Sequence, residues 1–165
     1  TIGEEVLRQK CEKVTKFDHS LEILVDAMYD TLAEADGVGL AAPQVGVDQR
    51  LFIVSLDDGT QKTFINPEIL ETSVETGPYN EGCLSVPGVY HDVIRPLEVT
   101  VFAQDVQGKS FTLKASGLLA RVIQHETDHL NGLLFTDRLS PEDREHVLKI
   151  YEKKQDVKKR KRKRG

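Results

Sequence analysis

Two histidines and a glutamate occupy positions that suit a metal ion, in the segment His-Glu-Thr-Asp-His at 125–129. Residues four apart share one face of an α-helix, so the imidazoles of His125 and His129 can bind the same metal. Glu126 lies between them and can reach a water held by that metal. Composition alone gives about 0.01 such matches in a chain of this length. The segment therefore predicts a metal-dependent reaction in which Glu126 moves a proton.

Two histidines need a further ligand to hold a catalytic metal. The metalloprotease pattern would place a histidine at position 135, where this chain has Phe135. Glu145 and Glu152 are acidic alternatives, but they belong to a charged segment. Cys83 is the better candidate, because thiolates bind zinc and iron(II) strongly and its surroundings, Glu81–Gly88, predict an irregular strand.

A glycine-rich segment covers Gly37–Gly46 and has the sequence Gly-Val-Gly-Leu-Ala-Ala-Pro-Gln-Val-Gly. Small residues let a backbone approach another group closely, and Gln44 offers an amide donor that does not titrate. A tight turn after a helix is the alternative interpretation. The segment lacks the Lys and Ser/Thr that end a phosphate-binding loop, so it predicts no nucleotide site.

Three helices are expected from the apolar spacing and the capping signals. They cover residues 20–36, 116–131 and 140–154, and the first two are followed by glycines. The second carries the histidines and is apolar on most of its sides, so we expect it to be buried. The third is highly charged and should lie on the surface.

Strands are expected in two hairpins and two further segments. The hairpins pair 51–56 with 63–65 and 97–103 with 110–114, and the further strands lie near 69–75 and 81–88. The order of helix, antiparallel strands, buried helix and surface helix predicts an α+β fold. We expect one domain over residues 1–157 and a short tail over 158–165.

The tail is basic, whereas the rest of the chain is acidic. All seven residues of Lys158–Arg164 are Lys or Arg, which leaves 15 of the 22 basic residues against 27 acidic ones, a net charge of −12. Like charges repel, so we expect this tail to be disordered. A basic run of this kind also attracts phosphate backbones.

Composition is typical of a water-soluble globular protein, with 39% hydrophobic and 30% charged residues. No apolar run is long enough to span a membrane, and the charged first ten residues predict no signal peptide. Two cysteines cannot build a disulfide framework, which favours a reducing compartment. We interpret Cys11 as a small buried side chain and the remaining histidines as surface residues: His19, His91 and His146.

Three motifs resemble those of the peptide deformylase family and occur in the family's order. They are Gly37–Gly46, Glu-Gly-Cys-Leu-Ser at 81–85 and Gln-His-Glu-Thr-Asp-His at 124–129. The resemblance covers about Gly3 to Tyr151. It implies antiparallel β-sheets packed around a central buried metal-binding helix, with N-terminal and C-terminal helices. It also implies a metal hydrolase that removes the formyl group from the N-terminal formylmethionine of new bacterial or organellar polypeptides.

The resemblance assigns roles to residues of these motifs. The family's metal ligands correspond to Cys83, His125 and His129. Glu126 corresponds to its general base and acid, and the Gln44 amide and Leu84 N–H to its oxyanion donors. One divalent metal is implied for each chain. Iron(II) is the family's usual native metal, and zinc, nickel or cobalt can replace it.

Substrate contacts are expected beside the metal. The substrate backbone pairs as an added strand with Gly39 and with Gly88–Tyr90. The slot for the methionine side chain is expected to be walled by Val38, Leu40 and Val122. Glu81 and Arg95 either orient the ligands or form an ordinary surface ion pair.

Two other functions compete with this interpretation. A zincin-type metallopeptidase would cleave internal bonds and take its third ligand from outside the Cys83 segment. An RNA-binding module would act through Lys158–Arg164, but it leaves the three motifs unexplained. A combined hypothesis is a deformylase whose tail holds it to ribosomal RNA. We expect N-formylmethionyl nascent peptides as substrates, no membrane partner, and the bacterial cytoplasm or an organelle as the location.

Overall fold

A computed structural model describes residues 10–83, 86–133 and 135–164 of the chain. Within these ranges, seven strands form two antiparallel sheets, one with the order β1-β2-β3-β6-β7 and one that pairs β4 with β5. The larger sheet consists of β1 (Gly39–Ala41), β2 (Leu51–Ser55), β3 (Gln61–Thr72), β6 (Glu98–Gln104) and β7 (Ser110–Ser116). The smaller sheet consists of β4 (Thr76–Cys83) and β5 (Val86–Pro96). Five helical elements complete the fold: α1 (His19–Ala35), η2 (Ala42–Val45), α2 (Gly117–Leu130), η3 (Phe135–Arg138) and α3 (Pro141–Arg164).

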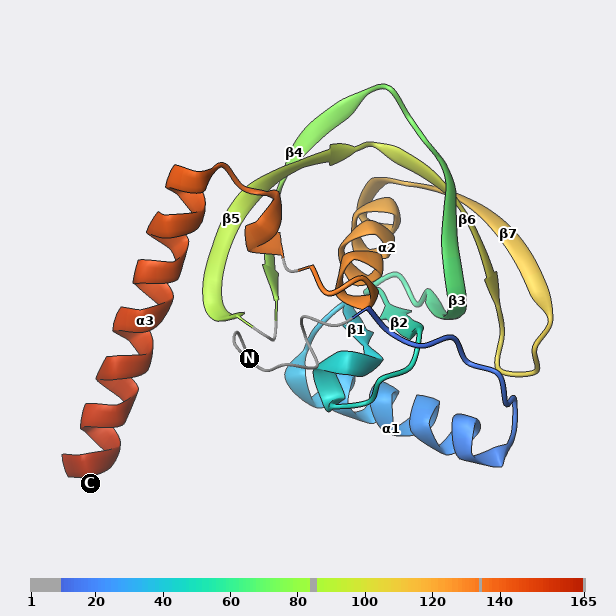
Figure 1. Cartoon of the computed structure of the whole chain (residues 1–165), viewed down its shortest axis with the longest axis horizontal. Coiled ribbons are helices and arrows are strands. Elements are labelled where there is room, and N and C mark those ends of the chain that lie inside the picture. The colour runs from blue at the N-terminus through green and yellow to red at the C-terminus, as the bar shows by residue number, and fades with distance from the viewer. Residues whose placement is uncertain (1–9, 84–85, 134, 165) are drawn as a thin grey trace.

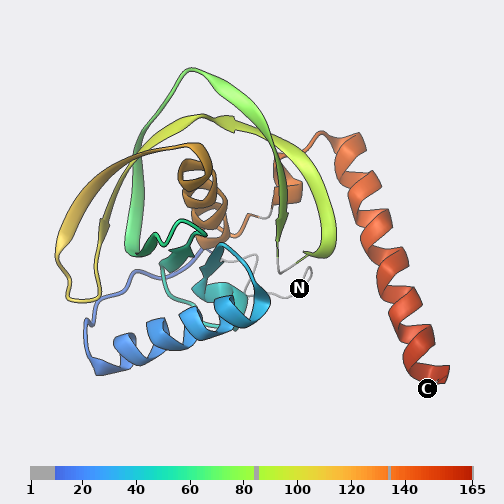
Figure 2. The same ribbon diagram turned by 180° about the vertical axis from the view of Figure 1, so that it is seen from behind.

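Helix α2 lies inside the arch that the strands form (Figures 1 and 2). It contacts β1, β2, β6 and β7, and ten of its fourteen residues are buried. Its C-terminal end is held by Arg50, whose Nη1 donates to the Leu130 carbonyl at 3.1 Å, and by the Cys11 N–H, which donates to the same carbonyl at 2.8 Å. A cation at a helix C-terminus opposes the negative end of the helix dipole. These contacts fix the helix that carries the histidines.

The core lies on both sides of β2. Alternate residues of a strand point to opposite faces, and Phe52 of β2 packs into the cluster that includes α2, where its ring stacks on that of Phe64 at 4.7 Å. Ile53 points the other way, into the cluster that includes the buried face of α1. Because both faces of β2 are buried, this strand lies between the cluster packed around α1 and the cluster packed around α2.

The α+β class, the helices around 20–36 and 116–131, and the second hairpin are confirmed. Two strand boundaries differ from the prediction. The segments near 63–65 and 69–75 form the single strand β3, which passes through irregularities in its pairing with β6. Of the segment near 81–88, residues 81–83 end β4 and residues 86–88 begin β5, while 84 and 85 lie outside the described residues. The polar composition of these two strands hides their long pairing register.

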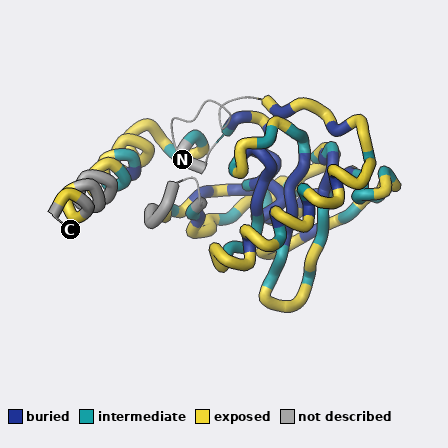
Figure 3. Tube along the Cα trace, turned by 90° about the horizontal axis from the view of Figure 1, so that it is seen from below, coloured by how far each residue is buried: buried dark blue, intermediate teal, exposed yellow. Residues whose placement is uncertain are grey.

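The third helix ends ten residues later than predicted, because α3 continues to Arg164 instead of ending near Lys154. Of the predicted tail over 158–165, residues 158–164 lie in α3, and Gly165 lies outside the described residues. Lys, Arg, Gln and Glu are good helix formers, and no Gly or Pro interrupts them before the end of α3. Figure 3 shows that α3 is exposed along most of its described length. No helix within the described ranges is long and apolar enough to cross a membrane.

Replacing Ile53 by Ala should lower the free energy of unfolding by about 3 kcal/mol, since a fully buried side chain is removed from the packed core. Ile94 of β5 is 71% exposed, and Ile94→Ala is the matched control, with an expected loss of about 1 kcal/mol or less. Urea denaturation of both variants measures the two losses. Equal losses would contradict the placement of the core.

Candidate metal centre

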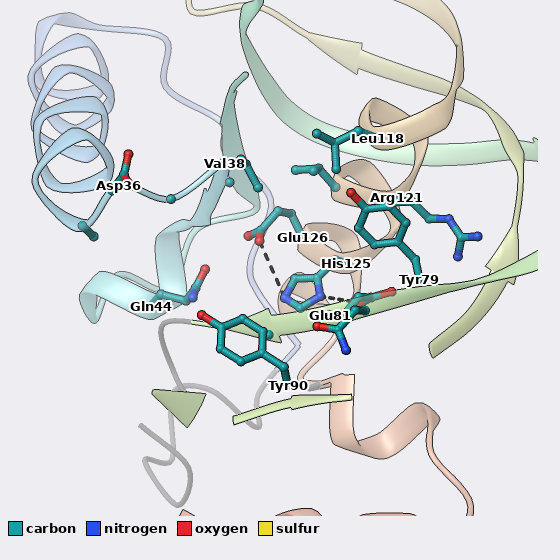
Figure 4. A pocket seen from close by; sticks show the side chains of 16 residues that line it. Asp36, Val38, Gln44, Tyr79, Glu81, Tyr90, Leu118, Arg121, His125 and Glu126 are labelled. Atoms are coloured by element: carbon teal, nitrogen blue, oxygen red, sulfur yellow. Dashed lines mark hydrogen bonds and ion pairs between the residues drawn. The ribbon is translucent and has the colours of Figure 1, made fainter. Parts of the chain in front are cut away.

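A cavity of about 460 Å³ lies against α2 (Figure 4). Its walls come from α2, from the segment that joins α1 to η2, and from strands β4 and β5. The lining includes Val38, Gly39, Gln44, Tyr79, Glu81, Tyr90, Leu118, Arg121, Val122, His125 and Glu126. The cavity therefore joins all three of the motifs that the sequence analysis selected.

Three potential ligand groups gather on α2, as the spacing predicts. The ligand atoms of His125, Glu126 and His129 all lie within 4.8 Å of one another. His125 Nε2 lies 3.9 Å from Glu126 Oε1, and the two side chains are 11% and 4% exposed. The imidazole rings of His125 and His129 meet edge to face, with centroids 5.1 Å apart. Helical geometry alone thus brings two imidazoles and a carboxylate to one point.

A buried ion pair orients His125. The Glu81 carboxylate lies 2.7 Å from His125 Nδ1 and accepts two hydrogen bonds from the Arg95 guanidinium, at 2.6 and 2.9 Å. Because the Nδ1–H donates a hydrogen bond to the carboxylate, the lone pair of the ring is on Nε2, the nitrogen that lies toward Glu126. Glu81 and Arg95 are thus not an ordinary surface pair, because both side chains are buried and they support a candidate ligand.

Burial and neighbouring charges prepare these groups for metal binding. Burial raises the pKa of the Glu126 carboxyl to about 7, although His125 nearby opposes this. Burial lowers the pKa of His129 well below its ordinary value, which keeps the imidazole in the neutral form that binds metals. For Glu81, burial favours a higher pKa, but the hydrogen bonds with His125 and Arg95 outweigh it and lower the pKa.

The donor set fits a divalent cation. Glu126 Oε2 is buried and has no hydrogen-bond partner within the described part of the chain. Burying an ionisable carboxylate beside two imidazoles costs free energy, and a cation in their midst would offset that cost. Cys83 ends β4 at the edge of this site, but its side chain lies outside the described residues. Leu84 also lies outside them.

The glycine-rich segment provides the wall opposite α2. The Ala41 N–H donates to Gln44 Oε1 at 2.9 Å, which fixes the side-chain amide at the cavity. A Cβ on Gly39 would lie 2.7 Å from Val122 Cγ1 and 3.0 Å from Glu126 Cγ. Only glycine lets β1 approach α2 this closely, so the segment is more than a tight turn.

The residues expected to bind the substrate fall in different places. Val38, Gly39, Val122 and Tyr90 line the cavity, and Gly88 lies in β5. Leu40 does not line it, which corrects the prediction: it is 2% exposed and belongs to the core beside α1. Neighbouring residues of a strand face opposite sides, so Gly39 and Leu40 cannot both face the cavity.

The lining residues that the sequence analysis missed include Tyr79, Leu118 and Arg121. Arg121 stands one helical turn before His125, and this spacing was a usable signal. Its Nη2 donates to the Gly77 carbonyl at 2.6 Å, and its guanidinium lies 5.6 Å from the Tyr79 ring centroid. These contacts hold the aliphatic part of Arg121 along the wall of the cavity.

Residues that were considered and set aside lie away from the site. Glu145 and Glu152 are exposed on α3, and His19 and His146 are exposed as well, whereas His91 is partly buried near Asp143. Cys11 is buried, and burial together with Asp48 raises the pKa of its thiol to about 11. The thiol is therefore protonated at neutral pH, in agreement with its interpretation as an inert core residue.

Comparison with known proteins places these features in one family. The family model described as polypeptide deformylase matches residues 1–145. A peptide deformylase from Picosynechococcus sp. is 48% identical over 145 residues, which is 86% of this chain and 78% of the relative. One from Borreliella burgdorferi is 44% identical over 155 residues, which is 93% of this chain and 94% of the relative.

Solved structures agree with the sequence relatives. A peptide deformylase from Legionella pneumophila superposes with a TM-score of 0.90 at 43% identity, over 96% of this chain and 95% of that one. A peptide deformylase from Synechococcus elongatus in complex with actinonin superposes with a TM-score of 0.85 at 43% identity, over 89% of this chain and 83% of that one.

Replacing His129 by Ala should weaken the binding of Zn²⁺ by more than about 100-fold, since the loss of a ligand exceeds the 10–100-fold effect of losing a supporting residue. Equilibrium dialysis followed by metal analysis measures the affinity. His19→Ala on α1 is the matched control, because the His19 side chain is 84% exposed. An unchanged affinity in the folded His129→Ala protein would show that the cation binds elsewhere.

Proposed function

The chain belongs to the polypeptide deformylase family, and from this membership we propose how its residues carry out the reaction of that family. It is a metal-dependent hydrolase that removes the formyl group from the N-terminal formylmethionine of newly made polypeptides. The observation that carries the residue assignment is the buried group of His125, Glu126 and His129, of which His125 and Glu126 line the cavity.

We propose that Cys83, His125 and His129 hold one divalent metal ion. Glu81 fixes His125 in the tautomer that this role requires, and burial keeps His129 neutral. Cys83 completes the set because it ends β4, two residues after Glu81 on the same strand. We propose iron(II) as the native metal, with zinc, nickel or cobalt as substitutes, since thiolate and imidazole ligands suit all of these ions.

Glu126 is the proposed proton carrier. When bound, the metal supplies a Lewis acid that activates water and polarises the formyl carbonyl. Glu126 takes the proton of the attacking water and delivers it to the nitrogen of the departing amine, so the C–N bond breaks to give formate and a free amino terminus. Its buried carboxylate lies 3.9 Å from His125 Nε2, the nitrogen proposed to bind the metal, and this supports the role.

Gln44 and the backbone stabilise the charge that develops on the formyl oxygen. The Ala41 N–H donates to the Gln44 side-chain oxygen and so orients the amide at the cavity, and an amide NH₂ is a hydrogen-bond donor of the kind that an oxyanion accepts from. We assign the second donor to the Leu84 N–H. Each such donor contributes about 3 kcal/mol to stabilisation of the transition state. Gln44 does not titrate, so its contribution is the same across the working pH range.

The methionine side chain and the peptide backbone occupy the rest of the cavity. We assign the apolar slot to Val38, Leu118 and Val122, which line the cavity near His125. The backbone adds as a strand beside Gly39 of β1 and the segment Gly88–Tyr90 of β5. Formyl is the smallest acyl group, and the packed wall formed by Gly39 against Glu126 leaves little room for acetyl.

We further propose that the catalytic domain covers residues 1–157 and that the basic end of α3 binds ribosomal RNA. The seven residues Lys158–Arg164 carry no acidic partner among them and extend α3 away from the strands (Figure 1). Nascent chains carry the formyl group as they leave the ribosome, so contact with RNA would raise the local substrate concentration. We therefore propose that the protein acts where ribosomes are present, in the bacterial cytoplasm or in an organelle that carries out protein synthesis.

Replacing Glu126 by Ala should lower the rate of formate release from formyl-Met-Ala-Ser by about 10²–10⁴-fold, the usual contribution of a general base. The metal content should stay close to that of the wild type, because the two imidazoles remain. Glu142→Ala at the exposed start of α3 is the matched control, and it should be fully active. Wild-type turnover by Glu126→Ala would remove Glu126 from the mechanism.

Replacing all seven residues of Lys158–Arg164 by Gln should reduce co-sedimentation with ribosomes at low salt, while formate release from a free peptide stays unchanged. Gln keeps the length and helix propensity of α3 but removes the charge. Binding of the wild type should fall steeply as salt is raised. Equal co-sedimentation of the two proteins at low salt would disprove the role of the tail.

A further inference from the structure

A continuous series of charged contacts runs from His125 to the protein surface. The Glu81 carboxylate lies 2.7 Å from His125 Nδ1, and the Arg95 guanidinium donates two hydrogen bonds to this carboxylate. The third guanidinium nitrogen of Arg95, Nη1, donates to Asp128 Oδ2 at 2.9 Å. Arg138 then donates to both oxygens of Asp128, at 3.0 Å from Nε and 2.6 Å from Nη2. We call Glu81, Arg95, Asp128 and Arg138 the charge relay.

Burial is very uneven along the charge relay. The side chains of Glu81, Arg95 and Asp128 are 6%, 5% and 8% exposed, whereas that of Arg138 is 47% exposed. Two carboxylates and two guanidinium groups balance, so the relay as a whole is neutral. Arg138 is therefore the one member that meets solvent, and it supplies half of the positive charge.

We propose that Arg138 is a positioning residue for the metal site, which acts through Asp128, Arg95 and Glu81 on the imidazole of His125. The inference rests on the proposed role of His125 as a metal ligand. Arg138 is not among the described residues that line the cavity, so in this proposal it influences the reaction through the relay.

The reason lies in the competition of two carboxylates for one guanidinium. With Arg138 in place, both oxygens of Asp128 accept hydrogen bonds from it, and Asp128 takes only Nη1 of Arg95. Arg95 can then donate its other two hydrogen bonds, from Nε and Nη2, to the two carboxylate oxygens of Glu81. Without Arg138, the buried Asp128 charge would be poorly compensated and would draw Arg95 away from Glu81. The Glu81 carboxylate, and with it the ring of His125, would lose a fixed orientation.

The position of Arg138 in the fold supports this role. Arg138 ends η3, the short element between α2 and α3, and Asp137 beside it pairs with Arg144 of α3 at 3.1 Å. Asp128 lies on α2 between the histidines in sequence, one residue before His129. The two-point contact of Arg138 with Asp128 therefore ties the segment after α2 back onto the metal-binding helix. An isolated surface ion pair would have no such buried partner.

The test uses Arg138→Gln in the full-length chain loaded with Co²⁺, and it measures the rate at which the metal is lost to EDTA. Loss of a supporting residue at a metal site has an effect of about 10–100-fold, and we expect release at least about 10-fold faster than in the wild type. In formate release, kcat should fall while KM for formyl-Met-Ala-Ser stays nearly constant. Arg138→Lys keeps the charge without the planar fork and should recover part of the loss.

Two further proteins decide whether the effect passes through the relay. Lys149→Gln, on an exposed part of α3, is the matched control and should release Co²⁺ at the wild-type rate, because the Lys149 side chain is 64% exposed. In an Asp128→Asn background, Arg138→Gln should add no further acceleration, because the contact through which it acts has lost its charge. Wild-type release by Arg138→Gln, or a full additional effect in the Asp128→Asn background, would overturn the inference. Metal release is measured without peptide, so it decides this inference even if no formate is produced.

Discussion

The hydrogen bond between the Glu81 carboxylate and His125 Nδ1 joins the two halves of the site. Glu81 belongs to β4 of the small sheet, and His125 belongs to α2 inside the large one, so the contact fixes the position of one sheet against the other at the cavity. It also decides which imidazole nitrogen carries the lone pair. Cys83, the proposed third ligand, ends the same strand two residues after Glu81, so the same contact also holds this end of β4.

The second constraint is the burial of so many polar groups on one helix. Helix α2 places two imidazoles and two carboxylates in an apolar setting, where each would be costly alone. Asp128 is compensated by Arg95 and Arg138, and Glu81 by Arg95. Glu126 pairs with no Arg or Lys among the described residues, and it is the group to which the proposed mechanism gives a moving proton. The distribution of guanidinium partners thus distinguishes the proposed proton carrier from Glu81 and Asp128.

Local spacing predicted what depends on local geometry. The helix around 116–131 and the meeting of His125, Glu126 and His129 follow from the period of an α-helix, and the order of elements sufficed for the α+β class. The role of Glu81 could not be decided, because it depends on the pairing of β4 with β5 and on burial of Arg95. Leu40 was assigned to the cavity wrongly, because the side to which each residue of a three-residue strand points depends on its pairing with β2, which the sequence does not show. The end of α3 was misjudged because charge repulsion was weighed above helix propensity.

X-ray absorption at the metal edge of the anaerobically purified chain tests the central claim most directly, since it reports the atoms bound to the ion. The account predicts one sulfur ligand at about 2.3 Å together with two imidazole nitrogens. A first coordination shell made only of nitrogen and oxygen would contradict it, because Cys83 would then not be a ligand and the strand that Glu81 positions would have no part in holding the metal.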